Sequence, residues 1–329
     1  MTTRPRVGFL GVGWIGRHRM EAMLKTGAVE AAAIADPSPE MAAEALKLAP
    51  DAKLVEGLDG LLAEALDGVV IATPSALHAE QSIRALEAGA AVFCQKPLGR
   101  TAAEARAVVE AARAADRLLA VDLSYRFTSG MQRIREMVQA GELGRIYAAD
   151  LVFHNAYGPD KGWFYDPELA GGGCVMDLGV HLVDLALWAL DFPELGPVSS
   201  HLLSGGEPLP AGKVEDYAVA QVELAGGVSV RLACSWRLPA GQDAVISVAL
   251  YGSDGGAALK NRDGSFYNFQ AVSYRGTATE NLVSDDGEWG GRAAADWAVR
   301  LAGGERFDPE AERLVTVADA LDRIYGRSG

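Results

Sequence analysis

Cysteine is scarce in this sequence. The 329 residues include only Cys94, Cys174 and Cys234. Three widely separated cysteines fit neither a disulfide framework nor the C-x-x-C spacing of zinc and redox sites. Their neighbours are small or apolar, so we expect buried free thiols in a reducing compartment and no metal site.

Positive charge and long apolar runs are also scarce. The 30 lysines and arginines stand against 44 aspartates and glutamates, a net charge of −14. Because such a surface repels polyanions and no basic run interrupts it, we expect no nucleic-acid partner. No secretory signal opens the chain, and no apolar run approaches the roughly 18 residues that span a bilayer. We therefore expect a cytoplasmic protein without a membrane partner.

The first half of the chain has the pattern of a parallel sheet. Over residues 1–122, short apolar runs alternate with helical patterns, which is typical of βαβ units. The predicted strands are Val7–Leu10, Glu30–Ala35, Gly68–Ala72, Ala91–Cys94 and Leu118–Asp122. The length of the chain favours two domains, and we assign the first to residues 1–122.

After residue 122 the pattern changes. Period-2 alternation is plainest over Val228–Trp236, where every second residue is apolar. The predicted elements are helices over Gly130–Ala140, Val175–Leu190, Arg292–Leu301 and Pro309–Tyr325, a strand over Ile146–His154, and successive strands over Val198–Phe269. We predict that residues 123–329 form an α+β domain with a large, mostly antiparallel, open-faced sheet. This domain is expected to bind substrate and to mediate oligomerisation, its C-terminal helix packing back on the first domain.

A glycine-rich segment predicts a dinucleotide site. The run Gly11-Val12-Gly13-Trp14-Ile15-Gly16 fits G-x-G-x-x-G and lies between a predicted strand and a predicted helix. Such glycines allow a tight turn, a close backbone approach to pyrophosphate, and close packing of helix on sheet. The helix N-terminus then presents N–H groups to the phosphates. A purely structural turn is the alternative.

The acidic residue after the second strand selects the cofactor. Asp36 lies twenty residues past the third glycine, where a carboxylate accepts hydrogen bonds from the adenosine ribose. Its charge repels a 2′-phosphate, and Pro37 and Ser38 follow it rather than an arginine. NAD is therefore favoured over NADP. The alternative is an ordinary turn aspartate.

Three further segments complete a family pattern. They are Ala72-Thr73-Pro74-Ser75-Ala76-Leu77-His78, Gln95-Lys96-Pro97-Leu98 and Gly171-Gly172-Gly173-Cys174-Val175-Met176-Asp177-Leu178-Gly179-Val180-His181-Leu182-Val183-Asp184. With the glycine fingerprint, they resemble the glucose-fructose oxidoreductase / inositol dehydrogenase (Gfo/Idh/MocA) family over essentially the whole chain. The resemblance implies an N-terminal Rossmann domain with a doubly wound parallel sheet, followed by the open-faced α+β domain. It is specific to the family and not to a substrate.

The resemblance also implies a catalytic set. In this family the lysine of a Glu-Lys-Pro segment and both polar residues of an Asp-x-x-x-His segment line the substrate pocket beside the nicotinamide, which map to Lys96, Asp177 and His181. Lys96 ends a predicted parallel strand, where α/β sheets bind ligands. Asp177 and His181 are four residues apart, so they share a helix face. A surface lysine and a solvated Asp/His pair are the alternatives.

Further positions follow from the same pattern. The residues assigned to cofactor binding are Gly11, Gly13, Trp14, Ile15, Gly16, Asp36, Thr73, Pro74, Ser75, His78, Gln95 and Lys96. Those assigned to substrate binding are Lys96, Tyr125, Arg126, His154, Trp163, Asp177 and His181. Gln95 departs from the family, which usually has glutamate there.

The predicted activity is reversible oxidation of a hydroxyl group of a sugar, cyclitol or related polyol. His181 takes the hydroxyl proton, Lys96 stabilises the oxygen, and Asp177 orients its partners. A glycosidase that uses NAD transiently and a non-catalytic NAD-binding regulator are the two rivals, because fold alone does not fix function. A homodimer or homotetramer is expected through the outer sheet face, which carries Arg231, Ala233 and Ser235.

Overall fold

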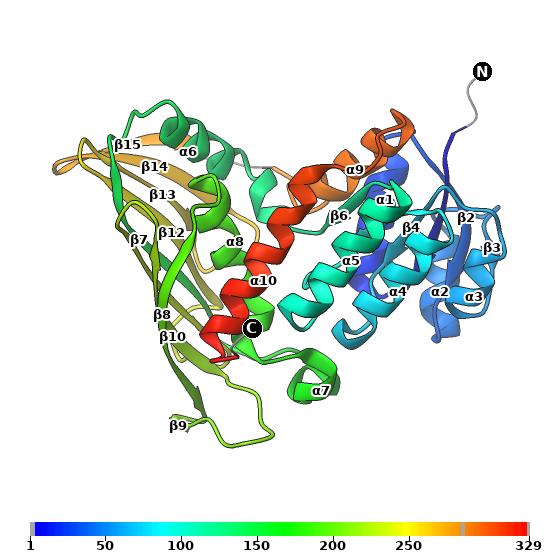
Figure 1. Cartoon of the computed structure of the whole chain (residues 1–329), viewed down its shortest axis with the longest axis horizontal. Coiled ribbons are helices and arrows are strands. Elements are labelled where there is room, and N and C mark those ends of the chain that lie inside the picture. The colour runs from blue at the N-terminus through cyan, green and yellow to red at the C-terminus, as the bar shows by residue number, and fades with distance from the viewer. Residues whose placement is uncertain (1–3, 284–286, 328–329) are drawn as a thin grey trace. The chain divides into compact units, whose positions relative to one another are not determined.

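The chain folds into two compact units. The structure, a computed structural model, describes residues 4–283 and 287–327. Unit 1 comprises residues 1–122 and 291–315, and unit 2 comprises residues 123–290 and 316–329 (Figure 1).

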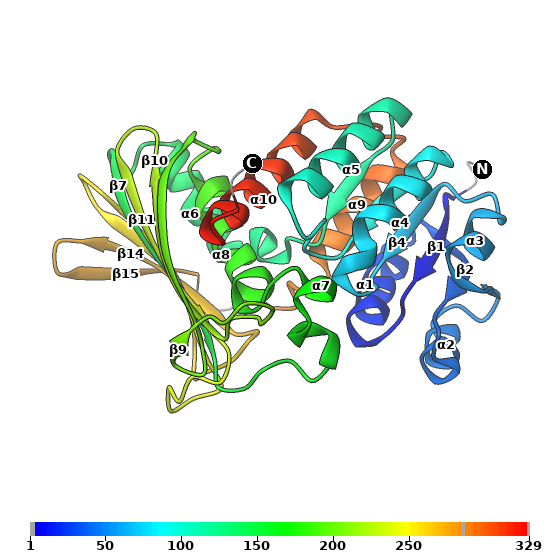
Figure 2. The same ribbon diagram turned by 60° about the horizontal axis from the view of Figure 1, so that its bottom comes forward.

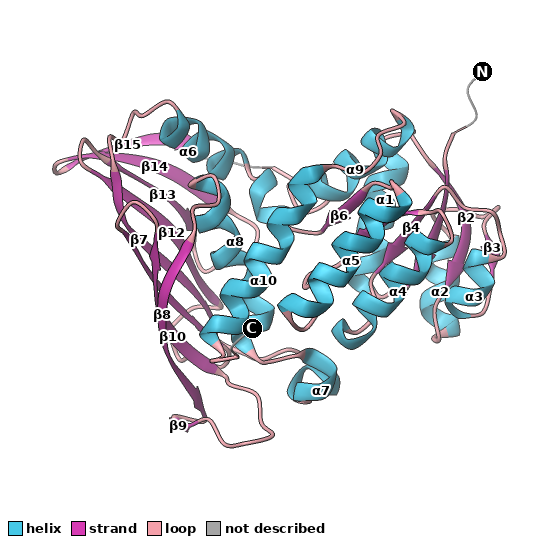
Figure 3. Cartoon of the chain, viewed as in Figure 1, coloured by secondary structure: helices cyan, strands magenta, loops and turns pink. Residues whose placement is uncertain are grey.

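Unit 1 is built on a parallel sheet in the strand order β3-β2-β1-β4-β5-β6; strands are drawn in magenta in Figure 3. Its strands are β1 (Arg6–Leu10), β2 (Glu30–Ala35), β3 (Lys53–Leu54), β4 (Gly68–Ile71), β5 (Ala91–Cys94) and β6 (Leu119–Val121). The adjacent strands β4 and β5 are buried at every residue, because helices cover both faces of a doubly wound sheet. The order reverses between β1 and β4, which is where such sheets bind ligands at their carboxyl edge. The predicted Rossmann architecture is confirmed.

The helices of unit 1 are α1 (Trp14–Lys25), α2 (Pro39–Leu46), α3 (Gly57–Leu62), α4 (Ser75–Glu87), α5 (Ala102–Ala115) and α9 (Arg292–Ala302), followed by the 3₁₀ turn η4 (Pro309–Glu312). Local capping fixes two of the starts. The hydroxyls of Ser38 and Thr101 accept hydrogen bonds from the N–H groups of Met41 and Glu104, at 3.3 and 3.2 Å. The strand β3 and the helix α3 escaped prediction because both are short and β3 is exposed.

Helix α9 corrects the predicted domain boundary. The second domain was expected to run to residue 329, but the structure places residues 291–315 in unit 1. The cause is the apolar face of α9: Trp297 is fully buried, and its ring lies 5.9 Å from that of Phe93 on β5. Gly68 leaves the space for this ring, since a Cβ there would lie 2.7 Å from it. Helix α9 packs on the sheet of unit 1, and the predicted packing of the C-terminal helix on the first domain stays a prediction.

Unit 2 is built on a nine-stranded sheet in the order β15-β14-β13-β12-β7-β11-β10-β8-β9. All neighbouring pairs are antiparallel except β7 and β11, which confirms the predicted mostly antiparallel sheet. The strands are β7 (Ile146–Asn155), β8 (Leu195–Ser204), β9 (Glu207–Pro208), β10 (Tyr217–Leu224), β11 (Val228–Ser235), β12 (Ala244–Gly252), β13 (Gly256–Asn261), β14 (Phe269–Arg275) and β15 (Ala278–Val283). Strand β15 was not predicted, because its residues are mostly exposed and show no alternation.

Helices cover one face of this sheet and leave the other open. Figure 2 shows α6 (Ser129–Gln139), α8 (Val180–Ala189) and α10 (Arg313–Ile324) on the same side of the strands. Shorter turns are η1 (Ser124–Phe127), η2 (Gly162–Tyr165), α7 (Pro167–Ala170) and the π-helical turn η3 (Val175–Gly179). On β11, Val228, Val230, Leu232 and Cys234 face the helices and are buried, as their alternation predicts.

One segment has the length and apolarity of a membrane span. Among the described residues, the most apolar 18-residue window within Pro167–Ala189 has a mean hydropathy of 1.3, and 89% of it is buried inside the protein. Asp177, His181 and Asp184 interrupt this window, so it is not a continuous apolar run. The segment contains α8, whose apolar residues form part of the core of unit 2.

Candidate active site

The glycine loop of unit 1 has the geometry of a phosphate cradle. Gly11 has a φ of +81°, and a Cβ there would lie 2.6 Å from the carbonyl oxygen of Ala72. A Cβ on Gly16 would lie 2.1 Å from the carbonyl oxygen of Gly11. Neither position therefore admits a side chain. Gly13 is the N-cap of α1, and within the described residues no side chain caps this helix. Its first N–H groups are thus available to an anion.

Asp36 lies beside this loop at the carboxyl end of β2. Its two carboxylate oxygens accept hydrogen bonds from the backbone N–H groups of Val12 and Ser38, at 2.7 and 2.8 Å. Each oxygen retains a further lone pair for a ribose hydroxyl. The loop and this carboxylate therefore fit an adenosine dinucleotide. Trp14 begins α1 and is 60% exposed, so its ring is open to a ligand at the same helix end.

His78, assigned to the cofactor, is instead a buried structural residue. It is 1% exposed, and its two ring nitrogens lie 2.6 and 2.7 Å from the carbonyl oxygens of Pro97 and Thr73. Burial lowers the pKa of His78, although both carbonyls favour the protonated ring. The imidazole joins the segment after β4 to the segment after β5, which includes Lys96. Pro74 is the N-cap of the intervening helix α4, and Ser75 is buried at its first position.

Gln95 also points into the interior rather than toward a cofactor. It is 6% exposed, and its amide donates a hydrogen bond to Asp122 Oδ2 at 2.6 Å. Arg19 Nε donates to the same oxygen at 2.6 Å. An amide satisfies this position because it supplies a donor, whereas a glutamate would place a second carboxylate beside the first. The departure from the family pattern is thus explained by a partner in unit 1.

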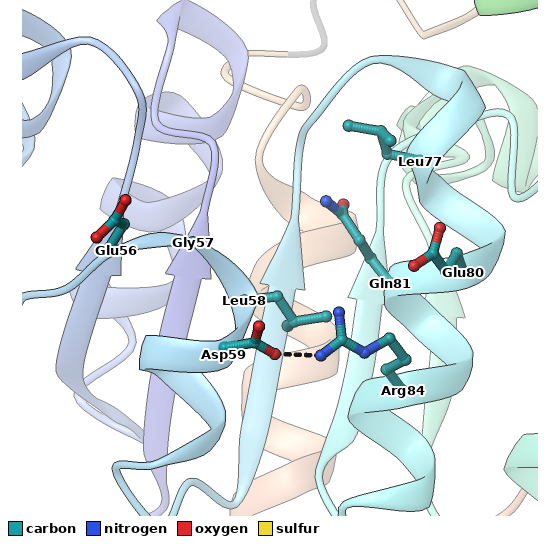
Figure 4. Close-up of a pocket in the computed structure, with 8 residues that line it drawn as sticks. All are labelled: Glu56, Gly57, Leu58, Asp59, Leu77, Glu80, Gln81 and Arg84. Atoms are coloured by element: carbon teal, nitrogen blue, oxygen red, sulfur yellow. Dashed lines mark hydrogen bonds and ion pairs between the residues drawn. The ribbon is translucent and has the colours of Figure 1, made fainter.

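Unit 1 also contains a pocket that the sequence did not predict. It has a volume of about 460 Å³ and lies between α3 and α4 (Figure 4). The lining residues are Glu56, Gly57, Leu58, Asp59, Leu77, Glu80, Gln81 and Arg84. An ion pair between Arg84 and Asp59 joins the two helices across it. Gln81 Oε1 accepts a hydrogen bond from Thr73 Oγ1 at 2.6 Å. This bond connects the pocket to the segment between β4 and α4, which is predicted to bind the cofactor.

In unit 2, a distant carboxylate fixes the start of the helix that includes Asp177 and His181. Glu215 is fully buried just before β10, and it accepts hydrogen bonds from the N–H groups of Gly173 and Val175, at 3.0 and 2.9 Å. It therefore does the work of an N-cap from forty residues away. Burial raises the pKa of Glu215, while these donors oppose the rise.

Tyr325, just past the end of α10, completes this network. Its hydroxyl donates to Glu215 Oε1 at 2.7 Å and accepts from the N–H of Met176 at 3.1 Å. The glycine run is explained by the same contacts. A Cβ on Gly172 would lie 2.1 Å from the Tyr325 hydroxyl, and one on Gly173 would lie 1.9 Å from the carbonyl oxygen of Glu215.

Exposure singles out the predicted catalytic residues. Every residue of 171–187 is buried except Asp177 and His181, which are partly exposed. In unit 1, every residue of 91–99 is buried except Lys96. All three side chains thus interrupt otherwise buried segments. Lys96 belongs to unit 1 and the other two to unit 2, and their action on one substrate remains a prediction.

Aromatic rings surround both residues of unit 2. The ring of Tyr125 lies 4.8 Å from that of His181, so these two predicted site residues are brought together. The indole Nε1 of Trp236 donates a hydrogen bond to Asp177 Oδ2 at 3.1 Å. Trp163 stacks on Phe164 at 3.8 Å, and Phe164 in turn lies edge-on to Trp236. The ring of Phe164 therefore lies between Trp163 and Trp236, the residue whose indole hydrogen-bonds to Asp177.

Two residues assigned to substrate binding are engaged elsewhere. Arg126 makes a bidentate ion pair with Asp184, which is 1% exposed, and its role in substrate binding stays a prediction. Burial raises the pKa of Asp184, against the opposing effect of Arg126. His154 lies on the open face of the sheet, where its Nδ1 is 2.8 Å from Ser235 Oγ and its ring stacks on Tyr217. Phe153 is the β7 residue that faces His181, because successive side chains alternate.

Both halves of the chain match one protein family. Residues 5–123 match an oxidoreductase family with an NAD-binding Rossmann fold, and residues 131–258 match the GFO/IDH/MocA C-terminal domain. The chain belongs to the Gfo/Idh/MocA oxidoreductase family. The predicted family, the NAD-binding Rossmann domain, NAD as cofactor and the oxidoreductase class are thereby confirmed.

Similar proteins of the Gfo/Idh/MocA family act on different sugars and cyclitols by name. D-glucoside 3-dehydrogenase of Escherichia coli (strain K12) is 34% identical over 60% of this chain and 60% of its own length. Inositol 2-dehydrogenase of Acidiphilium cryptum (strain JF-5) is 30% identical over 77% of this chain and 73% of its own. The solved structure of GenD2 from gentamicin A biosynthesis in complex with NAD is 25% identical, with a TM-score of 0.82 over 99% of this chain and 95% of that one.

The family pattern did not point to the residues that support the site. Glu215 and Tyr325 reach the helix of Asp177 from 40 or more residues away, and no local motif announces such partners. The sequence contained one signal for Trp236: it is the last apolar residue of the period-2 alternation that begins at Val228. The triple glycine was the other signal, since three consecutive residues without Cβ indicate a close approach of other groups.

Proposed function

We propose that this protein is an NAD-dependent dehydrogenase that oxidises, reversibly, a hydroxyl-bearing carbon of a sugar, cyclitol or related polyol. The proposal rests on one observation above all: Asp177 and His181 alone are partly exposed in the otherwise buried segment 171–187 of an NAD-binding oxidoreductase. A helix with a purely structural role does not require ionisable side chains at both of its partly exposed positions. The dehydrogenase and inositol names of its relatives favour the same substrate class.

The roles of the chain's own residues follow from their chemistry. His181 takes the proton of the substrate hydroxyl, since imidazole is the side chain that titrates near neutral pH. Lys96 donates a hydrogen bond to the same oxygen and stabilises the negative charge that develops on it. Asp177 is held by Trp236 and orients the substrate hydroxyl or the imidazole. Tyr125 packs against the imidazole ring and limits its rotation.

The cofactor is held by unit 1. The N-terminus of α1, Gly11 and Gly13 bind the pyrophosphate, and Asp36 binds the adenosine ribose. The pocket between α3 and α4 takes the adenine end, because Thr73 links it to the cofactor loop and Leu58 and Leu77 offer apolar walls. When bound, NAD⁺ supplies a hydride acceptor at the nicotinamide C4.

The decisive experiment is a substrate screen. Polyols, aldoses, cyclitols and glycosides are incubated with the protein and NAD⁺, and NADH absorbance and free sugar are both followed. NADH that accumulates in proportion to oxidised product supports the dehydrogenase. Free sugar released from a glycoside without net NADH indicates the transient-oxidation glycosidase. Tight NAD binding with no turnover of any compound indicates a regulator.

We also propose a cytoplasmic homodimer or homotetramer that assembles through the open sheet face. This face includes a small apolar cluster of Ala249, Ala258 and Val272, flanked by the half-buried Tyr251 and Tyr274. Two such faces are able to pack with each other. Light scattering checks the proposal, and a monomeric mass at micromolar concentration contradicts it.

A further inference from the structure

The indole of Trp236 donates a hydrogen bond to the carboxylate of Asp177. Trp236 is the first residue after β11, is 3% exposed, and its Nε1 lies 3.1 Å from Asp177 Oδ2. An indole N–H is a donor only, so this bond always points at the carboxylate. A hydrogen bond to an ionised group is stronger than one between neutral groups, and a buried donor is costly to leave unpaired.

The indole is itself held in place from several sides. The backbone N–H of Trp236 donates to the carbonyl oxygen of Asp216 at 2.7 Å. The rings of Tyr165 and Phe164 meet the indole edge-on, with centroids 5.6 and 6.3 Å away. These contacts fix both the backbone and the ring plane. The N–H therefore has one direction, and it sets the position of Oδ2.

We infer that Trp236 is a positioning residue for the dehydrogenase reaction, acting only through Asp177. The inference rests on the proposed role of Asp177 as an orienting carboxylate. Because the bond fixes one carboxylate oxygen, the other is aimed by the rigid geometry of the group. Without the indole N–H, Oδ2 loses the donor that Trp236 supplies, and the fraction of turnovers that begin with a correctly oriented carboxylate falls.

The test is a double-mutant cycle. Trp236→Phe keeps an aromatic ring but removes the N–H, and we expect it to lower kcat about tenfold, the loss of one hydrogen bond to a charged group. KM for NAD⁺ should not change, because Trp236 is not among the residues proposed to hold the cofactor. In a chain that already has Asp177→Ala, which offers the indole no side-chain acceptor, the same substitution should lower kcat much less. Two independent, multiplying losses would overturn the inference.

Two further variants serve as controls for this double-mutant cycle. Site-specific 3-benzothienylalanine at position 236 retains the shape of tryptophan without its N–H, and it should reproduce the loss in kcat even if the phenylalanine variant folds poorly. Trp289→Phe is the matched control: Trp289 is 5% exposed and donates its N–H to the carbonyl oxygen of Tyr267 at 2.8 Å. Its effect on kcat, whatever the size, should be the same with and without Asp177→Ala.

The outcomes separate this inference from the function on which it rests. A wild-type protein that forms no NADH with any polyol refutes the proposed function and the role of Trp236 with it. An Asp177→Ala variant with full kcat leaves the dehydrogenase activity standing but refutes the orienting role of Asp177, and therefore that of Trp236. Full kcat in both position-236 variants, together with a depressed kcat in Asp177→Ala, refutes the role of Trp236 alone.

Discussion

Removal of one hydroxyl group should destabilise unit 2 by a predictable amount. Tyr325→Phe leaves the ring in place but deletes the donor to Glu215 Oε1 and the acceptor for the Met176 N–H. A lost hydrogen bond to a charged group and an unpaired buried N–H together cost about 2–4 kcal/mol. No cavity forms, because only one atom is removed. The whole effect is therefore assigned to the two hydrogen bonds.

The loss of folding stability caused by Tyr325→Phe should also depend on pH. Burial raises the pKa of Glu215 above its ordinary value of 4.5, and the Tyr325 hydroxyl opposes that rise. In Tyr325→Phe the folded-state pKa is therefore higher still. A raised folded-state pKa means that stability falls as pH rises from the unfolded value through the folded one. The variant loses more over this interval than the wild type, so the difference between them is larger at neutral than at acidic pH.

Urea unfolding followed by circular dichroism measures both effects. Tyr147→Phe is the control, because Tyr147 is 47% exposed and its substitution should change stability by less than about 0.5 kcal/mol. If Tyr325→Phe costs no more than this control, or costs more at acidic than at neutral pH, the Glu215 network does not hold the helix as described.

Three other predictions test the cofactor site, the buried hydrogen bond between Gln95 and Asp122, and the ion pair between Arg126 and the buried Asp184. Asp36→Ala should weaken NADH binding and reduce the preference for NAD over NADP, and tryptophan fluorescence titrations with both cofactors check this; a wild type that binds NADP as tightly as NAD contradicts it. Gln95→Glu places a second carboxylate beside Asp122 and should lower the melting temperature at neutral pH, with partial recovery as the pH falls. Unchanged melting at both pH values would contradict the contact. Arg126→Met leaves the buried Asp184 without its cation and should cost about 3–5 kcal/mol in urea unfolding. A cost below that of a typical surface substitution would show that the pair is not buried.

The sequence predicted the framework of the molecule better than its supports. The strands of unit 1 are recognisable because burial on both faces demands continuous apolar runs, as in Ala91–Cys94. The return of α9 to unit 1 was missed, because the amphipathic pattern of a helix does not reveal which core it joins. His78 and Arg126 were assigned to ligands by their positions in family motifs. Their carbonyl and carboxylate partners come from other segments, and local spacing contains no information about them.

The partners of the predicted catalytic residues show the same limit. The spacing of Asp177 and His181 indicated a shared helix face, and their exposure within a buried segment agrees with it. Nothing near them in the chain indicated that Glu215 caps their helix. Long-range hydrogen bonds of this kind depend on the folded arrangement of strands, and they become visible only in the structure.

Turnover by two alanine variants tests the central claim most directly. Lys96→Ala and His181→Ala are assayed for NADH formation with the best polyol of the substrate screen, and their NADH affinity is measured by fluorescence. We expect kcat to fall by roughly two to four orders of magnitude in each variant, because a proton acceptor or a cation at the reacting oxygen is lost. NADH affinity should remain close to that of the wild type. Near-normal kcat in either variant would contradict the mechanism, as would a loss of activity explained by loss of cofactor binding.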